Sequence, residues 1–410
     1  MRIVFLSPSG ELGGAETALL DILAVVRHAR PEWTLTMIAA SDGPLIARAA
    51  AYADTSALAF PDALARLGEW GARGSVASHA RFAAGLLTAS AATIGYMRRL
   101  QEHLRNLNPD IIHSNGLKMH LLAARARTPG AKLVWHLHDY PTRRRMSAQL
   151  LASQTHRCDA MLANSESVAA EARRRFGTRP PVHTIYNSVD LDRFNPVGPT
   201  TDLDALARLP PLPDGAIRIG LVATFARWKG HAVFLDALAQ LRDLPHVRGY
   251  IVGGAIYNTD ASQFSRDELR DRAAALGLGD AVGFTGHVAD VPAVLRTLDV
   301  VVHASTEPEP FGLVIAEAMA CGRPVVVSRA GGAAEIAQGG AVCHEPGNGA
   351  DLARCLRQLA QDPARRASLG AEGRRAAQRL FSRDRLQDAL IPVYENLARS
   401  AGATHVDVIK

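Results

Sequence analysis

Short apolar runs alternate with helical patterns along almost the whole chain, and this alternation limits the possible folds more than any other feature. Residues 2–7 (RIVFLS) form an apolar run of strand length, and residues 16–26 (ETALLDILAVV) carry the apolar spacing of a helix after a glycine turn. The strand pattern recurs in LTMIAA, DIIHS, KLVWHLH and AMLANS. Strands that alternate with helices predict a doubly wound parallel α/β sheet.

The alternation stops in a segment with five prolines, residues 196–215, and then begins again. Strand patterns return in IRIGLVAT, RGYIVGG, AVGFTG, DVVVHAS and PVVVS. We therefore predict an N-terminal domain at residues 1–195, a linker region, and a second, similar domain at residues 216–381. A last helical pattern, within residues 382–410, is expected to pack back on the N-terminal domain.

Composition narrows the classes of function. Of the 410 residues, 48% are apolar and 21% charged, which is enough for two packed cores. The net charge of +6 suits anionic ligands. No basic stripe interleaved with aromatic residues indicates a nucleic-acid partner. The four cysteines lack CxxC spacing and indicate reduced thiols: Cys158, Cys321, Cys343 and Cys355.

The chain carries no pattern typical of a membrane span or a secretory signal. No run of about 18 apolar residues occurs, and the apolar run after Arg2 is too short for a signal peptide. We therefore expect a cytoplasmic protein. Arg98, Arg99 and the run 143–145 suggest peripheral contact with lipid head groups at the inner face of the membrane, or with anionic acceptors; solvated surface charge is the alternative.

Ligands of open α/β sheets bind at the carboxyl ends of the strands, so the loops there are expected to carry the chemistry. One such loop, residues 307–312 (EPEPFG), leads into a helical pattern at residues 313–321. Backbone amides near Phe311, Gly312, Leu313 and Val314 would point out of the helix start and form an anion site.

Two carboxylates border this helix start. Glu309 precedes the helix, and Glu317 lies about one turn inside it. Eight residues at about 100° each place them about 80° apart around the axis, so both could reach one elongated ligand. A solvated acid beside a glutamate favoured by the helix dipole is the alternative. Glu307 lies in the same loop.

A second loop, TFARWKG at residues 224–230, follows the first strand of the second half. Arg227 and Lys229 could neutralise a diphosphate there. Two surface cations near a helix start are the alternative reading.

The N-terminal half offers weaker signals. Gly13 and Gly14 allow close approach of a ligand, although a plain tight turn accounts for them equally. His136 and His138 share one face of a strand; we expect one to contact a ligand and the other to be a core histidine. Neither this pair nor the DLD tripeptides at Asp190 and Asp202 predicts a metal site. We interpret both aspartates as surface and capping residues.

Taken in order, the motifs resemble those of the retaining family 4 glycosyltransferases, over nearly the whole chain. These enzymes have the GT-B fold, two Rossmann-like domains that face each other across a cleft. The matching segments are GGAE at 13–16, HD at 138–139, YNSVDLDRFNP at 186–196, WKG at 228–230, VGG at 252–254, FTGHV at 284–288, and the E-x7-E pair of Glu309 and Glu317.

The resemblance implies a nucleotide-diphosphate sugar as co-substrate, with no other cofactor and no metal. Glu309 would contact hydroxyls of the donor sugar, and Glu317 the ribose. His138, Arg227, Lys229 and Glu309 would form the catalytic set. The implied donor-binding set is Gly13, Gly14, Gly253, Gly254, Gly286, His287, Phe311, Gly312, Leu313, Val314 and Glu317.

One position departs from the family pattern. The family usually carries an arginine five residues before the motif lysine, where this chain has Thr224. Arg227 is our candidate to replace that phosphate contact.

The function expected from the resemblance is sugar transfer to a glycan, glycolipid or small-molecule acceptor with retention of configuration. Family habit suggests envelope polysaccharide or glycolipid assembly. A nucleotide-sugar 2-epimerase of related fold and a non-catalytic nucleotide-sugar-binding protein remain as alternatives. A glycosidase is a poorer fit, because its two carboxylates must flank the scissile bond.

Overall fold

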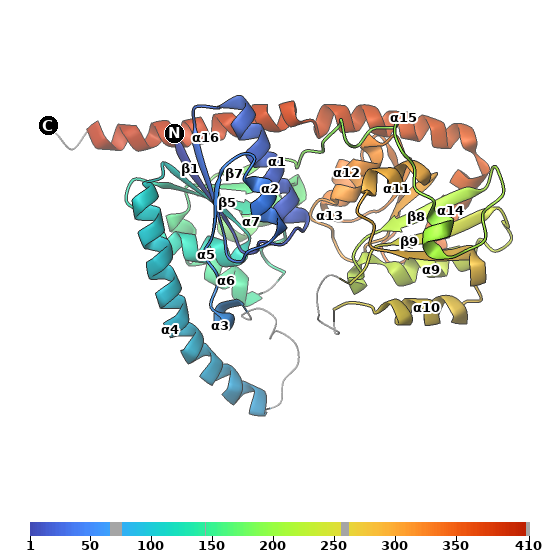
Figure 1. Ribbon diagram of the computed structural model, residues 1–410, viewed down its shortest axis with the longest axis horizontal. Helices are drawn as coiled ribbons and strands as arrows, with labels where there is room; N and C mark the ends of the chain where they lie inside the picture. Colours follow the sequence, from blue (N-terminus) through green and yellow to red (C-terminus); the bar gives the residue numbers. More distant parts are fainter. Residues whose placement is uncertain (66–75, 144, 256–261, 407–410) are drawn as a thin grey trace. The chain divides into compact units, whose positions relative to one another are not determined.

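The computed structural model consists of two compact units (Figure 1). Unit 1 comprises Met1–Asn187 and Leu386–Lys410, and unit 2 comprises Ser188–Arg385. The structure describes residues 1–65, 76–143, 145–255 and 262–406.

Unit 1 is built on a seven-stranded sheet with the order β3-β2-β1-β4-β5-β6-β7. All neighbouring strands pair in parallel. The order reverses between β1 and β4, and this topological switch point is where doubly wound sheets bind ligands. The strands are β1 Arg2–Ser7, β2 Thr34–Ala39, β3 Asp54–Ala57, β4 Ile111–Asn115, β5 Lys132–Leu137, β6 Ala160–Ala163 and β7 Val182–Thr184.

Helices cover both faces of this sheet. Because side chains alternate along a strand, Ile112 and Trp135 join the core on one face, while Phe5 and Val134 join the core on the other. The helices are α1 Gly14–Ala29, α2 Pro44–Ala49, α3 Asp62–Ala65, α4 Val76–Leu107, α5 Leu117–Ala126, α6 Arg145–Ala152, the 3-10 helix η1 Thr155–Arg157, α7 Glu166–Phe176 and α16 Arg383–Val406.

Unit 2 has the same architecture, with six parallel strands in the order β10-β9-β8-β11-β12-β13. Its switch point lies between β8 and β11. The strands are β8 Ile217–Val222, β9 Val247–Val252, β10 Val282–Gly286, β11 Val300–His303, β12 Val325–Ser328 and β13 Ala341–His344. The helices are α8 Leu203–Ala207, η2 Arg227–Lys229, α9 His231–Ala239, α10 Arg266–Ala275, η3 Gly279–Ala281, α11 Val291–Thr297, α12 Leu313–Ala320, α13 Gly331–Ile336, α14 Gly349–Gln361 and α15 Pro363–Leu380.

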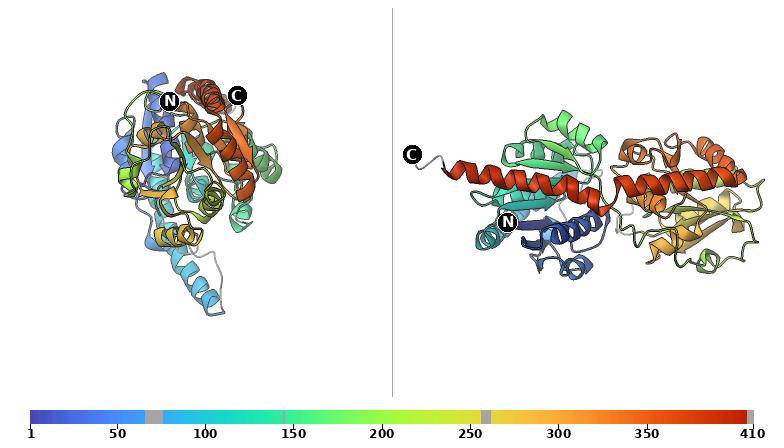
Figure 2. Two further views of the ribbon diagram at one scale, coloured as in Figure 1. Left: turned by 90° about the vertical axis from the view of Figure 1, so that its right-hand side faces the viewer. Right: turned by 90° about the horizontal axis from the view of Figure 1, so that it is seen from above.

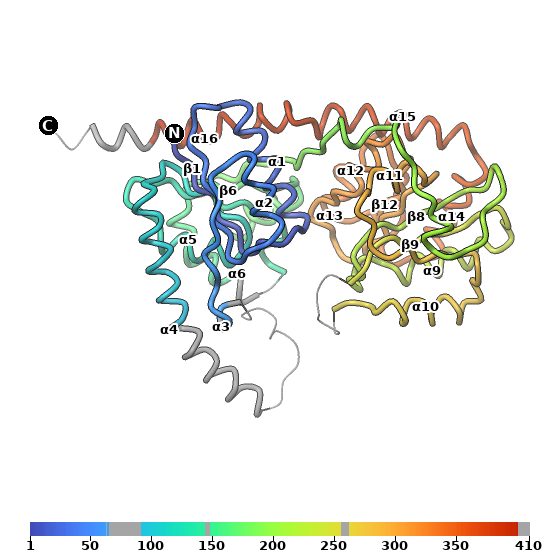
Figure 3. The backbone as a smooth tube through the Cα atoms, in the orientation of Figure 1, coloured from blue at the N-terminus to red at the C-terminus, as the bar shows by residue number. Residues whose placement is uncertain are grey.

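The helix α16 belongs to both units along its length. It starts in unit 2 and continues into unit 1 from Leu386, and the backbone trace in Figure 3 can be followed through it. Leu390, Ile391 and Tyr394 are almost fully buried in the core of unit 1. Figure 2 shows α16 lying against that unit.

The two predicted parallel α/β sheets are confirmed. Asp202 is a capping residue, as predicted, because it accepts a hydrogen bond from Ala205 N at the start of α8. Asp190 caps none of the described helices: it accepts from two backbone amides of a turn at 3.1 Å and pairs with Arg383. The segment predicted as a linker region, residues 196–215, lies in unit 2 and contains α8. All four cysteines are free thiols.

Candidate functional site

The loops after β8 and β11 meet at the switch point of unit 2. Lys229, at the end of η2, and Glu309, six residues beyond β11, form an ion pair with 2.6 Å between Nζ and Oε2. The loops are also joined by the backbone, since Thr306 N donates to Trp228 O at 2.8 Å. The structure thus brings together the two residues that the sequence predicts for the charged centre of the site.

Glu309 is held from several sides. Its Oε2 lies 3.3 Å from His303 Nε2 and accepts a hydrogen bond of 3.2 Å from Ser305 Oγ. Its carbonyl accepts from Gly332 N at 2.8 Å, which fixes the backbone against the start of α13. Burial favours the neutral acid, but Lys229 and His303 outweigh it and lower the pKa of Glu309 to about 2. Glu309 is therefore a carboxylate at neutral pH and can only accept hydrogen bonds.

Helix α12 begins beside Glu309. Gly312 is its N-cap, with a φ of 91°, and has no side chain to cap the first turn. The amides of Leu313 and Val314 therefore gain no N-cap acceptor from Gly312, and both residues are only half-buried. This geometry suits an anion or a sugar hydroxyl, as the sequence predicts. Glu317 lies half-buried within the same helix.

The glycine loops of unit 2 pack directly against each other. A Cβ on Gly230 would lie 1.8 Å from the carbonyl oxygen of Ala304, and one on Gly253 would lie 2.0 Å from that of Ala223. Gly253 N donates to Gly286 O at 2.9 Å, so two of the predicted donor loops are in contact. Gly254 accepts from Phe225 N at 3.1 Å. These backbone segments can approach so closely because glycine has no side chain.

Three further predicted residues of unit 2 are Arg227, Phe311 and His287. Arg227 forms an ion pair with Glu268 at 2.7 Å and stacks over the ring of Phe264, 4.3 Å from its centroid. Phe311 is buried, and its ring packs edge-on against another aromatic ring of the core. His287 is exposed in the loop after β10. A phosphate contact by Arg227 would require it to leave Glu268 and remains a prediction.

In unit 1 the predicted glycine loop and His138 are linked by Asn115. Gly13 N donates to the carboxylate of Glu16, which closes the first turn of α1. Asn115, the last residue of β4, donates from Nδ2 to Ala15 O at 3.3 Å, and its Oδ1 contacts Nε2 of His138. The side chain of Asn115 therefore connects the start of α1 with the residue that follows β5.

Further histidines lie beneath His138. His113 and His136 have buried rings 5.2 Å apart, and His136 packs against His138 with 3.9 Å between centroids. Full burial lowers the pKa of His113 to about 3, and desolvation by the surrounding chain lowers that of the half-buried His138 to about 3, so both rings are neutral at pH 7. Within the described residues, no group of three or more His, Cys, Asp or Glu side chains is arranged to hold a metal ion.

Asn115, His303 and Ser305 were missed by the sequence reasoning. Each ends a strand at a switch point or lies within two residues of its end, in the stretches DIIHSN and VVVHAS. A polar residue at the end of an apolar strand is the sequence signal that could have indicated these residues. The strand order needed to interpret it becomes known only from the structure.

The basic residues suggested for membrane contact are partly outside the described residues. Arg143 pairs with Asp139 at 3.2 Å, whereas Arg144 and the side chain of Arg145 are not described. Arg98 and Arg99 are exposed on α4. Over the residues described, none of the helices combines the length and apolarity that a membrane crossing needs.

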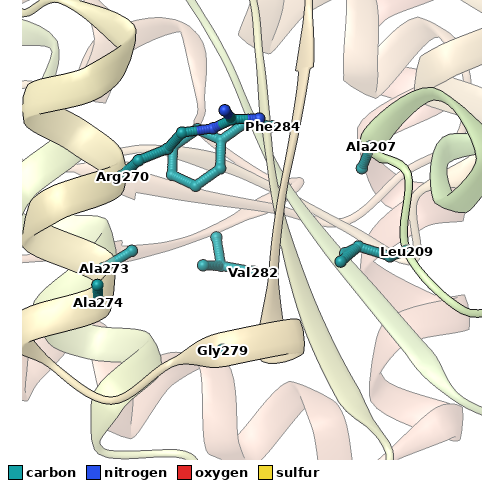
Figure 4. Close-up of a pocket in the computed structure, with 8 residues that line it drawn as sticks. All are labelled: Ala207, Leu209, Arg270, Ala273, Ala274, Gly279, Val282 and Phe284. Carbon is teal, nitrogen blue, oxygen red and sulfur yellow. The ribbon is translucent and has the colours of Figure 1, made fainter.

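A separate hollow of about 230 Å³ lies along β10, the edge strand of unit 2 (Figure 4). Val282 and Phe284 of β10, Arg270 of α10 and Leu209 line it. None of these residues belongs to the charged centre around Lys229 and Glu309.

Comparisons with known proteins agree with this architecture. The model of the Glycosyltransferase Family 4 domain matches residues 13–193, and the model of Glycosyl transferases group 1 matches residues 207–376. Among curated relatives, D-inositol 3-phosphate glycosyltransferase from Streptomyces bingchenggensis is 32% identical over 248 residues, which are 59% of this chain and 53% of the relative. The same-named protein from Salinispora arenicola is 33% identical over 255 residues, 60% of this chain and 56% of the relative. The chain thus spans about half of the length of these relatives.

Solved structures resemble the chain over nearly its full length. The Anabaena protein HepE in complex with UDP has a TM-score of 0.76 at 25% identity, covering 97% of this chain and 100% of that one. Sucrose-phosphate synthase from Thermosynechococcus elongatus shares the fold, with a TM-score of 0.76 at 20% identity and coverage of 98% and 100%. The two family models together account for most of the chain, which therefore belongs to glycosyltransferase family 4 and has the two-domain α/β architecture of the GT-B fold.

Proposed function

We propose that this protein transfers a sugar from a nucleotide-diphosphate sugar to a hydroxyl-bearing acceptor with retention of configuration. The observation that carries the proposal is the Lys229–Glu309 pair at the switch point of unit 2, beside the start of α12. Family membership supports the reaction class.

The residues around the pair suit two adjoining parts of such a donor, the diphosphate and the sugar. The ammonium of Lys229 and the first amides of α12 would hold the diphosphate and stabilise the charge that develops on it as it leaves. The ionised Glu309 would accept hydrogen bonds from hydroxyls of the donor sugar. These groups supply the stabilisation without a metal ion, and we propose that none is needed. Retention would follow from attack on the same face of the sugar, assisted by the leaving phosphate.

The low pKa of Glu309 argues against the glycosidase alternative. A glycosidase needs one carboxylic acid whose pKa is raised, so that it can protonate the leaving oxygen. Glu309 has the opposite shift, to about 2, because Lys229 and His303 stabilise its charge against burial.

UDP-sugars are our first candidates for the donor. The Anabaena protein HepE has been solved with UDP, with UDP and glucose, and with UDP-glucose, and shares 25% identity with this chain. The curated relatives are named for D-inositol 3-phosphate, a polyol phosphate, so we propose a polyhydroxylated acceptor of the glycan, glycolipid or small-molecule class.

The first test is thermal stabilisation by UDP, GDP and ADP, followed by the matching sugar nucleotides. A ligand at about 100 times its Kd adds about 2.7 kcal/mol. We expect the nucleotide with one of these bases to raise the melting temperature of the parent and to leave that of Lys229→Ala unchanged. No shift with any nucleotide would contradict the donor site.

Product analysis then separates the alternatives. Transfer to an added polyol acceptor with the donor's anomeric configuration is the expected result. An inverted product would contradict retention. A change in the sugar nucleotide without acceptor would indicate the 2-epimerase, and binding without turnover would indicate the non-catalytic protein.

A further inference from the structure

Asn115 joins the two elements that border the switch point of unit 1. It ends β4, which lies between β1 and β5 in the sheet, and its side chain is fully buried. Nδ2 donates to the carbonyl of Ala15 in the first turn of α1, and Oδ1 contacts Nε2 of His138, just beyond β5. A single amide thus contacts both predicted ligand-facing elements of this unit.

The contact with Ala15 fixes which way the amide faces. A backbone carbonyl can only accept a hydrogen bond, so Nδ2 must face Ala15 and Oδ1 must face His138. The reversed amide would place two oxygen atoms against each other at the Ala15 contact. Because Oδ1 is an acceptor, the hydrogen in the contact with His138 must come from Nε2.

A neutral imidazole carries one N–H, so a proton on Nε2 leaves a lone pair on Nδ1. His138 is only half-buried, and within the described part of the chain no hydrogen bond reaches Nδ1. We infer that Asn115 is a positioning residue that holds His138 in the Nε2–H tautomer, so that Nδ1 accepts a hydrogen bond from a substrate hydroxyl. This inference rests on the proposed function for the identity of the substrate.

The tautomer restricts which part of a substrate can lie against His138. A sugar or polyol hydroxyl can donate a hydrogen bond to the lone pair on Nδ1. Oxygen atoms of an ionised phosphate carry no hydrogen to donate and would face that lone pair unfavourably. The imidazole therefore selects the hydroxylated part of the substrate and rejects the phosphates.

The tautomer can be measured directly on the full-length protein by NMR of ¹⁵N-labelled histidine side chains, with His138→Gln assigning the signals. We expect protonated Nε2 and unprotonated Nδ1 in the parent. We expect Asn115→Ala to give a mixture of tautomers. The matched control is Asn164→Ala, because Asn164 donates to the backbone carbonyl of His138 at 3.5 Å and not to the ring. The tautomer of His138 in this variant should be the same as in the parent. A parent with protonated Nδ1, or an unchanged tautomer in Asn115→Ala, would overturn the inference.

A second variant covers the case in which Asn115→Ala does not fold. Asn115→Asp keeps an acceptor toward Nε2 and adds a negative charge, so the titration of His138 should move to higher pH while Nε2 stays protonated. An unchanged titration would show that residue 115 does not contact the ring and would overturn the inference.

Turnover supplies the functional readout. At metal-ligating histidines, losing the orienting partner typically costs about 10–100-fold in activity. By analogy we expect kcat of Asn115→Ala to fall by about that factor with UDP affinity unchanged. A parent with the expected tautomer but no transfer from any donor would contradict the proposed function and leave the positioning role intact. A parent that transfers sugar with the other tautomer would overturn the positioning role alone.

Discussion

Glu309 depends on Lys229 for its charged state. Glu309 is almost fully buried, and a buried carboxylate without a partner would be destabilising. The ammonium of Lys229, 2.6 Å away, removes much of that cost. A diphosphate that binds Lys229 must share it with Glu309, so sugar hydroxyls that donate to Glu309 would replace part of the lost stabilisation. Donor sugar and diphosphate should therefore bind cooperatively at this pair.

We expect Glu309→Gln to change how the stability of unit 2 depends on pH. The pKa of Glu309 is lowered from 4.5 to about 2 in the folded state, because Lys229 and His303 favour the carboxylate against burial. A lowered folded pKa contributes stability that is fully present above about pH 4.5 and is lost as the pH falls toward 2. The free energy of unfolding in urea should be higher for the parent than for Glu309→Gln at pH 7. This difference should become smaller as the pH is lowered to 3.

Glu307→Gln is the matched control for this experiment. Glu307 is exposed in the same loop, two residues from Glu309, and no narrowing gap is expected for it. A gap between the parent and Glu309→Gln that is constant over this range would contradict the low pKa. Sugar-nucleotide affinity should fall only in Glu309→Gln.

At the scale of elements, α8 is attached to the sheet of unit 2 by one buried carboxylate. Asp204 Oδ1 lies 2.5 Å from Arg248 Nη1 and from the hydroxyl of Tyr250, both on β9. Burial disfavours its charge, but these two partners and the amide of Leu212 outweigh burial and lower its pKa. Asp204, the second of the five residues of α8, therefore anchors this short helix to the sheet.

We expect Asp204→Ala to destabilise unit 2 by about 3–5 kcal/mol, because it leaves the buried guanidinium of Arg248 without its carboxylate. The control is Asp202→Ala in the same segment, which removes only the exposed N-cap of α8 and should cost about 1 kcal/mol. Calorimetry of the two variants measures the difference. Equal losses would contradict the anchoring role of Asp204.

The sequence predicted the central strands because they are continuous apolar runs, and these hold the switch points. The short edge strands β3 (DTSA) and β7 (VHT) escaped prediction, since neither forms an apolar run. Lys229 and Glu309 could be predicted from their loops. Asn115 could not be assigned a role, because its two partners come from different segments that only the strand order brings together. Arg227 shows the converse: its ion pair with Glu268 has no signal in the local sequence.

At the scale of the whole molecule, the two units place their candidate groups at equivalent positions. In unit 1 the first turn of α1, which follows β1, meets the end of β4 at Asn115, and in unit 2 the loops after β8 and β11 meet at Lys229 and Glu309. The first strand of each sheet thus supplies a glycine-containing loop, and its neighbour across the switch point supplies polar side chains. One architecture, used twice, presents two different chemistries: a neutral histidine with an asparagine, and a charged pair.

The chain passes between the units twice, and α16 makes the second passage. Tyr394 of α16 is fully buried in unit 1, and its hydroxyl lies 2.7 Å from His113 Nδ1. We expect Tyr394→Ala to cost about 3–5 kcal/mol through loss of the ring. That loss should lower the melting temperature of unit 1 by about 6–20 °C. Tyr394→Phe keeps the ring and leaves His113 without this partner, so it should cost only about 1–3 kcal/mol.

Calorimetry of the full-length variants tests whether the units unfold separately. If they do, Tyr394→Ala should lower the temperature of one unfolding transition and Asp204→Ala that of the other, because the two residues are buried in different units. A nucleotide that binds at Lys229 should raise only the transition that Asp204→Ala lowers, by the mass action of a ligand on the state that binds it. One transition that moves as a whole in both variants would show instead that the units unfold as a single cooperative body, with α16 transmitting the loss from one unit to the other.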